Sequence, residues 1–133
     1  MPMPAYPFIP KSTRWLKRGQ YWAIPLDEGL FGAGCVVGVL TSIDGKASLR
    51  SFIAGVLQWV GQSPPTPEVL TGRGLVGFAF AHLKAITESG GCILGEADLE
   101  LSGVPNSAES LSLPTWGYGV PTIIARKLAK NAG

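Results

Sequence analysis

The chain has 133 residues and a mass of 14.0 kDa, the size of one domain, with 46% hydrophobic and only 15% charged residues. This composition is too apolar for a disordered chain, and the apolar stretches fall short of the roughly 20 residues that a membrane-spanning helix needs. We therefore expect a globular domain with no membrane partner. A net charge of +2 does not call for a nucleic-acid partner either, and we do not expect one.

Residues 1–18 are predicted to form a Pro-rich and basic N-terminal arm ahead of a single β-rich domain at 19–133. Four prolines among the first ten residues prevent the uninterrupted apolar helix of a secretory signal. The basic part of the arm consists of Lys11, Arg14, Lys17 and Arg18. With no export signal in the sequence, the cytoplasm is the expected location.

Backbone chemistry decides the expected fold class. The 18 glycines and 11 prolines make up about 22% of the chain, against about 12% in an average protein. Both residues are unfavourable inside helices and common at turns and bulges, so the sequence predicts many short strands. We expect a mainly β fold: a strongly bent antiparallel sheet or a partly open small barrel, with one or two short helices.

Two strands are predicted near the start of the domain. Residues 19–26 are rich in aromatic and β-branched side chains, and Pro25 restricts this strand to an edge or places it at the strand's end. A turn at Asp27–Gly29 follows, and then a strand at 31–40. Its glycines at 32, 34 and 38 share one face, which lets the strand bend or lets another backbone approach closely.

Turn and cap signals divide the middle of the chain. Residues 42–46 predict a hairpin turn before an apolar run at 49–60. Thr66 as N-cap, Pro67 at the first helical position and Gly72 as terminator predict a one-turn helix.

The second half is less clearly patterned. Residues 75–86 fit either a strand or a helix, because Phe78 and Phe80 alternate as in a strand while 83–88 have helical propensity. Residues 120–128 are predicted to form a strand that passes into a short terminal helix.

Catalytic and metal-binding chemistry is hard to find in this sequence. Acid–base catalysis most often uses a positioned histidine, and this chain has one histidine, His82. It lies in an apolar run, where a histidine usually has a structural role. Cys35 and Cys92 lie far apart and have no metal-ligand spacing with His82. We expect two buried thiols, no catalytic residue, no metal and no cofactor.

The charge pattern is more informative. Between Ala85 and Ala125 there are five acidic residues and no Lys or Arg, a local charge of −5. Within this window the run at 95–101 alternates acidic and apolar residues, so on a strand Glu96, Asp98 and Glu100 would share one face. Carboxylates at this spacing lie about 6.6–6.8 Å apart.

Several interpretations of these carboxylates are open. They could belong to a solvated edge strand whose charges prevent aggregation, or they could attract a basic protein partner. A calcium site is a further alternative, although the order of an EF-hand loop is missing. The basic arm, or the basic tail with Arg126, Lys127 and Lys130, could also fold over them and form an internal salt-bridge network.

The motifs at 19–26 and 27–34 resemble the opening of the immunity protein 26 family. That opening has a basic stretch, then G-x-x-[FW]-A-I-P-L, an acidic-glycine turn and a [YF]-G-x-G strand. The run at 91–95 resembles a later segment of the family, although Glu96-Ala97-Asp98 replaces the expected proline. The well-matched part covers 19–34, and the looser match covers 15–101.

The resemblance implies a mainly β protein that binds and neutralises a bacterial polymorphic toxin, with no catalytic residues to carry over. The matched residues have structural explanations as core, edge and turn positions: Trp22, Ile24, Pro25, Gly29, Gly32 and Gly34. Joining this implication to the charge pattern, we predict an immunity protein whose cognate toxin, for example a basic nuclease, contacts an acidic surface. The predicted partner-binding residues are Glu96, Asp98, Glu100 and Glu109.

Two other classes of function remain open. A ribonuclease barrel of the toxin–antitoxin type would need an acid–base set, such as Arg50 or Arg73 with Glu28 and His82. A small barrel that binds nucleic acid or a small ligand would use the basic patch from Lys11 to Arg18. The sequence does not indicate an oligomeric state.

Overall fold

The computed structural model describes residues 4–41, 47–104 and 114–132. Six strands form one sheet in the order β5-β1-β2-β3-β4-β6. The strands are β1 (Gln20–Pro25), β2 (Phe31–Thr41), β3 (Ala47–Gly61), β4 (Leu75–His82), β5 (Gly95–Glu96) and β6 (Thr115–Trp116). The helices are α1 (Pro67–Leu70), α2 (Lys84–Thr87) and α3 (Val120–Ala132), with 3-10 turns at Thr13–Trp15 and Asp27–Gly29.

The sheet is open and is built on an antiparallel meander of β1 to β4, which confirms the predicted mainly β fold. Register shifts interrupt the β2–β3 ladder at three places and the β3–β4 ladder at one. Such bulges bend strands and increase their twist. Two details differ from the prediction: β6 pairs parallel to β4, and the described residues contain three α-helices, with α3 spanning 13 residues.

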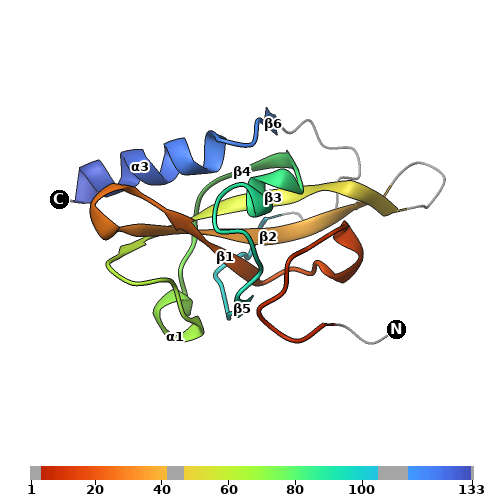
Figure 1. Cartoon of the computed structure of the whole chain (residues 1–133), viewed down its shortest axis with the longest axis horizontal. Coiled ribbons are helices and arrows are strands. Elements are labelled where there is room, and N and C mark those ends of the chain that lie inside the picture. The colour runs from red at the N-terminus through yellow and green to blue at the C-terminus, as the bar shows by residue number, and fades with distance from the viewer. Residues whose placement is uncertain (1–3, 42–46, 105–113, 133) are drawn as a thin grey trace.

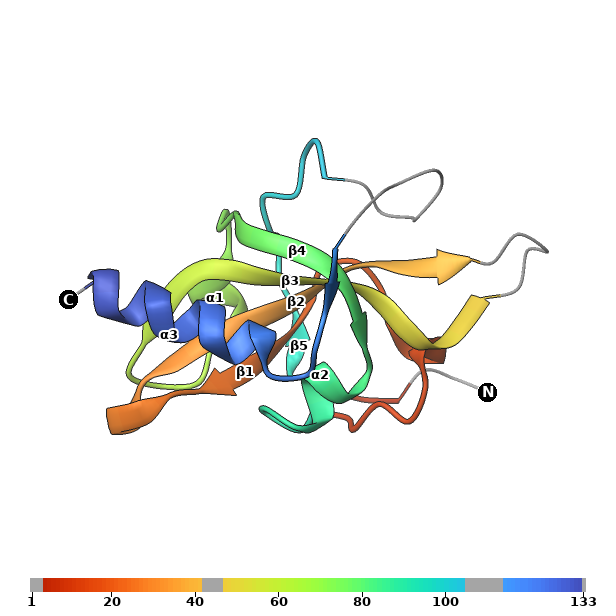
Figure 2. The ribbon, with the colours of Figure 1, turned by 90° about the horizontal axis from the view of Figure 1, so that it is seen from above.

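Hydrophobic clusters cover both faces of the sheet. The first lies under α3, α2 and the N-terminal arm and includes Trp22, Phe52, Ile86 and Ala125. The second lies under α1 and residues 94–104 and includes Tyr21, Ile53, Leu57 and Leu70. Figure 1 shows α3 and α1 on opposite sides of the sheet, and Figure 2 shows α3 lying over β2 and β3.

The glycine face of β2 brings α3 close to the sheet, as the sequence predicted for such a face. A Cβ atom built on Gly32 would lie 2.7 Å from the Cβ of Ala125 in α3, and one on Gly34 would overlap the indole of Trp22 at 2.3 Å. Because Cβ contacts this short do not occur, the glycine at 32 allows the close approach of α3, and the glycine at 34 makes room for the Trp22 indole of the neighbouring strand β1.

Local signals placed most element ends correctly. Thr66 caps α1 by accepting a hydrogen bond from the Val69 amide, and Gly72 has φ +77° just beyond it. Residues 75–86 are both a strand and a helix, since β4 leads into α2. The turn predicted at 42–46 lies outside the described residues.

The strand predicted at the start of 120–128 is wrong. The β-branched run there is helical from Val120 onwards, and Pro121 occupies the first turn, where proline is tolerated. Helical spacing places Ile124, Ala125 and Leu128 on the inner side of α3, and Ala125 is fully buried. Packing of this apolar stripe outweighs the weak strand preference of isoleucine.

Among the described residues, no helix is long and apolar enough to span a membrane.

Candidate functional site

The side chains of Glu96, Asp98 and Glu100, which we call the acidic strip, project to solvent from the segment that follows α2. Ala97 and Leu99 lie between them and pack against the second hydrophobic cluster. The predicted alternation is therefore present, but only Gly95–Glu96 pairs as a strand. Beyond Glu96 the chain has no strand pairing, and the Leu99 amide donates to the carbonyl of Ala97 at 3.1 Å, a tight turn at Asp98.

Main-chain hydrogen bonds hold this segment in place. The Ala97 amide donates to the carbonyl of Gly19 at 3.0 Å, and the Gly72 amide donates to the carbonyl of Asp98 at 2.8 Å. The Glu100 amide donates to the carbonyl of Arg73 at 2.9 Å. The segment thus bridges the start of β1 and the turn after α1, and its side chains remain directed outward.

Arg18 fixes the far end of the same segment. Its guanidinium donates to the main-chain oxygens of Val37 at 3.1 Å, Leu101 at 2.6 Å and Val104 at 2.9 Å. All three acceptors are carbonyls, so Arg18 connects β2 to residues 101–104 without a carboxylate partner. A charged donor makes stronger hydrogen bonds than a neutral one.

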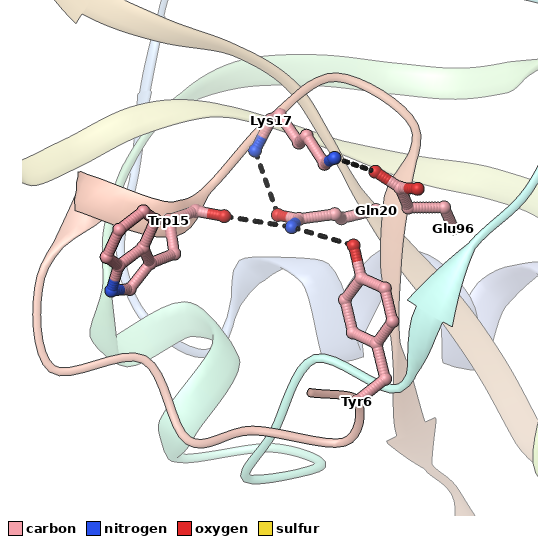
Figure 3. Close-up of polar contacts among 5 residues, drawn as sticks. All are labelled: Tyr6, Trp15, Lys17, Gln20 and Glu96. Atoms are coloured by element: carbon pink, nitrogen blue, oxygen red, sulfur yellow. Dashed lines mark hydrogen bonds and ion pairs between the residues drawn. The ribbon is translucent and has the colours of Figure 1, made fainter. Parts of the chain in front are cut away.

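Part of the arm lies against the acidic strip, as one of the open interpretations required. Nζ of Lys17 lies 2.9 Å from Oε1 of Glu96, and both side chains are about half exposed. Glu96 raises the pKa of Lys17 by accepting its hydrogen bond and by its charge. Figure 3 shows this ion pair beside Gln20, on the edge where the arm meets β5.

Gln20 is a fully buried amide that anchors the arm. Its Nε2 donates to Oη of Tyr6 at 3.2 Å and to the carbonyl of Trp15 at 2.9 Å, and its Oε1 accepts from the Lys17 amide at 2.9 Å (Figure 3). Lys17 is therefore held at its backbone by Gln20 and at its side chain by Glu96.

The other carboxylates differ in their surroundings. Asp98 makes no side-chain hydrogen bond or ion pair within the described part of the chain. Glu100 accepts hydrogen bonds from the amide of Ser102 at 3.0 Å and from its hydroxyl, and these lower the pKa of Glu100. Glu100 therefore keeps its negative charge at neutral pH. Glu109, the fourth predicted partner-binding residue, lies outside the described residues.

The basic tail does not cover the strip. Its residues Arg126, Lys127 and Lys130 lie on α3, which packs on the first cluster, whereas the strip covers the second cluster on the opposite face. Nε of Arg126 lies 3.6 Å from Oδ2 of Asp27 instead. Of the two possible internal partners, only the arm reaches the strip.

The acid–base set considered for a ribonuclease is not brought together. His82 pairs with Ser51 near the start of β3, next to Arg50. Glu28 lies in the turn between β1 and β2, near the other end of β3, where Phe31 pairs with Gly61. Ten residues of β3 separate these ends, about 33 Å at 3.3 Å per residue. The Nδ1 of His82 accepts from the Lys84 amide at 3.1 Å, a local structural contact.

The cysteines are free thiols of different character. Cys35 is fully buried in β2, and burial raises its pKa to about 12, whereas Cys92 is partly exposed. The prediction of two buried thiols therefore holds for Cys35 alone. Among the described residues, no group of three or more His, Cys, Asp or Glu side chains could hold a metal ion.

Sequence reasoning missed Arg18 and Gln20, the residues that position the strip and the arm. The carbonyls that Arg18 contacts at 101 and 104 lie 83 and 86 residues away in the sequence. Nothing in local spacing indicates contacts of that range. The one available signal was a glutamine placed inside an otherwise apolar strand.

No family model, no curated protein and no solved structure matches the chain. The resemblance to the immunity protein 26 family thus stays a prediction from the sequence.

Proposed function

We propose that this protein is a cytoplasmic immunity protein that binds a cognate bacterial polymorphic toxin and neutralises it without catalysis. The observation that carries the proposal is the acidic strip: three exposed carboxylates on a segment whose main chain is bonded to the fold at both ends. The sequence resemblance supplies the class of partner.

The strip suits a basic partner for two physical reasons. Its backbone is already ordered, so binding costs little conformational entropy in the segment. Its three carboxylates occupy every second residue and are all exposed, and a row of negative charge is what a nuclease's basic cleft accepts from its substrate. Such a row accelerates association and selects against partners of the wrong charge.

The test uses the cognate toxin domain, which the proposal expects to be encoded by the gene next to that of this protein. Reversal of the strip, Glu96→Lys with Asp98→Lys and Glu100→Lys, is expected to weaken binding roughly 100-fold and to abolish protection of cells that express the toxin. The matched control reverses three exposed carboxylates outside the strip, Asp27, Glu28 and Glu88, and is expected to retain both.

Full protection by the strip variant would remove the strip from the mechanism. Growth arrest and RNA degradation on expression of this protein alone would instead support the ribonuclease alternative and overturn the proposal as a whole.

A further inference from the structure

Three basic side chains lie together on the outer face of α3. Arg126, Lys127 and Lys130 are exposed on it, and helix α3 contains no acidic residue. A shallow hollow of about 170 Å³ lies between these three side chains and Ile123. The net charge of the chain is only +2, because the negative charges of the acidic strip on the other side of the sheet offset the positive charges of this face.

An exposed aromatic ring lies just before the start of the same helix. Tyr118 is 43% exposed. Its ring centroid lies 5.5 Å from that of His82 and 5.4 Å from Nζ of Lys84. The ring thus contacts two side chains, one at the end of β4 and one at the start of α2, and retains free surface. Figure 2 shows α2 near the end of α3 where the helix begins.

We propose that this face, formed by Lys84, Tyr118, Arg126, Lys127 and Lys130, binds single-stranded nucleic acid. The cations contact phosphates and the tyrosine stacks on a base, which is the combination that binds single strands without sequence preference. The helix places Lys130 about 15 Å from Val120, at 1.5 Å per residue. The face is therefore long enough to contact several successive phosphates.

The structure favours nucleic acid over an anionic membrane. A membrane-surface helix inserts its apolar stripe into lipid, but the apolar stripe of α3 packs on the sheet, with Ala125 fully buried. On the outer side of α3, Ile123 is the one large hydrophobic residue that is strongly exposed among the described residues. Asp27 and Glu28 border the face at the β1–β2 turn and limit it on that side.

This surface is separate from the one proposed to bind a toxin. The acidic strip would repel a nucleic acid, and α3 lies on the opposite face of the sheet. The basic patch at Lys11–Arg18 is a poorer candidate, because Lys17 is paired with Glu96 and Arg18 is engaged by three carbonyls. On α3 Arg126 is paired with Asp27, but Lys127 and Lys130 make no ion pair within the described residues.

The test is fluorescence anisotropy with labelled single-stranded RNA and DNA of about 12 nucleotides, at salt concentrations from about 50 to 200 mM. We expect binding that weakens with salt, and a loss of roughly tenfold or more in Lys127→Glu with Lys130→Glu. The matched control, Lys11→Glu with Arg14→Glu, changes the net charge equally at residues outside the face and is expected to stay within about twofold of the parent. Tyr118→Ala should weaken binding further, whereas Tyr118→Phe should retain it.

Three results would overturn the proposal. The first is that the folded parent protein shows no salt-dependent binding even at the lowest salt. The second is that the arm control loses as much affinity as the α3 variant, and the third is that Tyr118→Ala and Tyr118→Phe bind with equal affinity. Binding to vesicles of phosphatidylserine and phosphatidylcholine without oligonucleotide binding would assign the face to a membrane instead. Circular dichroism and thermal melting of each variant confirm that the comparison is between folded proteins.

Discussion

Nζ of Lys17 and Oε1 of Glu96 lie 2.9 Å apart, so the protein's own arm neutralises the first carboxylate of the acidic strip. A basic partner must displace Lys17 or contact only Asp98 and Glu100. The ion pair is exposed to solvent, and pairs of this kind add little to stability. Its main effect is on the charge that the strip presents.

We therefore predict that Lys17→Gln leaves the midpoint of urea denaturation almost unchanged and accelerates association with the cognate toxin. The Gln20 bond to the residue-17 amide survives the change, because it involves the backbone. Stopped-flow association at low and high salt measures the effect, which should shrink as salt screens the charges. Slower association in the variant would mean that Lys17 itself contacts the partner.

Gln20→Leu tests how the arm is anchored. The substitution removes three hydrogen bonds from a fully buried side chain and leaves polar groups of Tyr6, Trp15 and Lys17 without their partner. We expect a loss of about 2–3 kcal/mol in the free energy of unfolding, with faster amide exchange in residues 4–18. Tyr6→Phe, which removes one of these bonds, should cost about 1 kcal/mol or less. Equal losses in the two variants would contradict the assignment of Gln20 as the anchor.

Gly32→Ala tests the close contact between β2 and α3. The added methyl group would lie 2.7 Å from the Cβ of Ala125, and overpacking of this kind costs about 1–3 kcal/mol. Adding Ala125→Gly removes the overlap, so the double variant should be more stable than the sum of the single effects predicts. Gly117→Ala is the control, since nothing lies within 4 Å of a Cβ there. Strict additivity in the cycle would argue against the contact.

Cys35 makes stability depend on alkaline pH. Burial raises the pKa of its thiol to about 12, whereas an unfolded chain has a thiol pKa of about 8.5. Above about pH 8.5 the unfolded state loses this proton and the folded state keeps it, so stability falls as the pH rises, by up to about 1.4 kcal/mol per pH unit. Burial also raises the pKa values of Tyr6 and Tyr21, which adds a decline of the same sign at higher pH.

Urea denaturation between about pH 8 and pH 10 measures this decline. Cys35→Ala should flatten it in that range, and Cys92→Ala, at a partly exposed thiol, should leave it as in the parent. An unchanged slope in Cys35→Ala would show that the thiol does not stay protonated in the folded protein.

Where the determining contacts are local, the sequence predicted the structure well. The cap, first turn and terminator of α1 lie within seven residues, from Thr66 to Gly72. The alternation of Glu96, Asp98 and Glu100 was also predictable, because the residues between them pack against the second cluster. The prediction of a strand at the start of 120–128 failed, because the hydrophobic surface that favours a helix there belongs to β1, β2 and β3, which are distant in the sequence.

The candidate site was predictable in its charges but not in its support. Whether a basic segment covers the strip depends on where two distant parts of the chain meet, and charge alone allowed both the arm and the tail. Lys17 reaches Glu96 because Gln20 fixes its backbone, and that bond depends on burial that only the folded sheet creates.

The segment that carries the strip is attached by peptide groups at Ala97, Asp98, Glu100, Leu101 and Val104. Each of these bonds would form with almost any residue at the position concerned. The backbone conformation of the segment therefore does not depend on which side chains it carries. The outward-facing residues can be exchanged for others of different size or charge, and the backbone will hold them in the same positions. A scaffold of this kind lends itself to retargeting by substitution at positions 96, 98 and 100 alone.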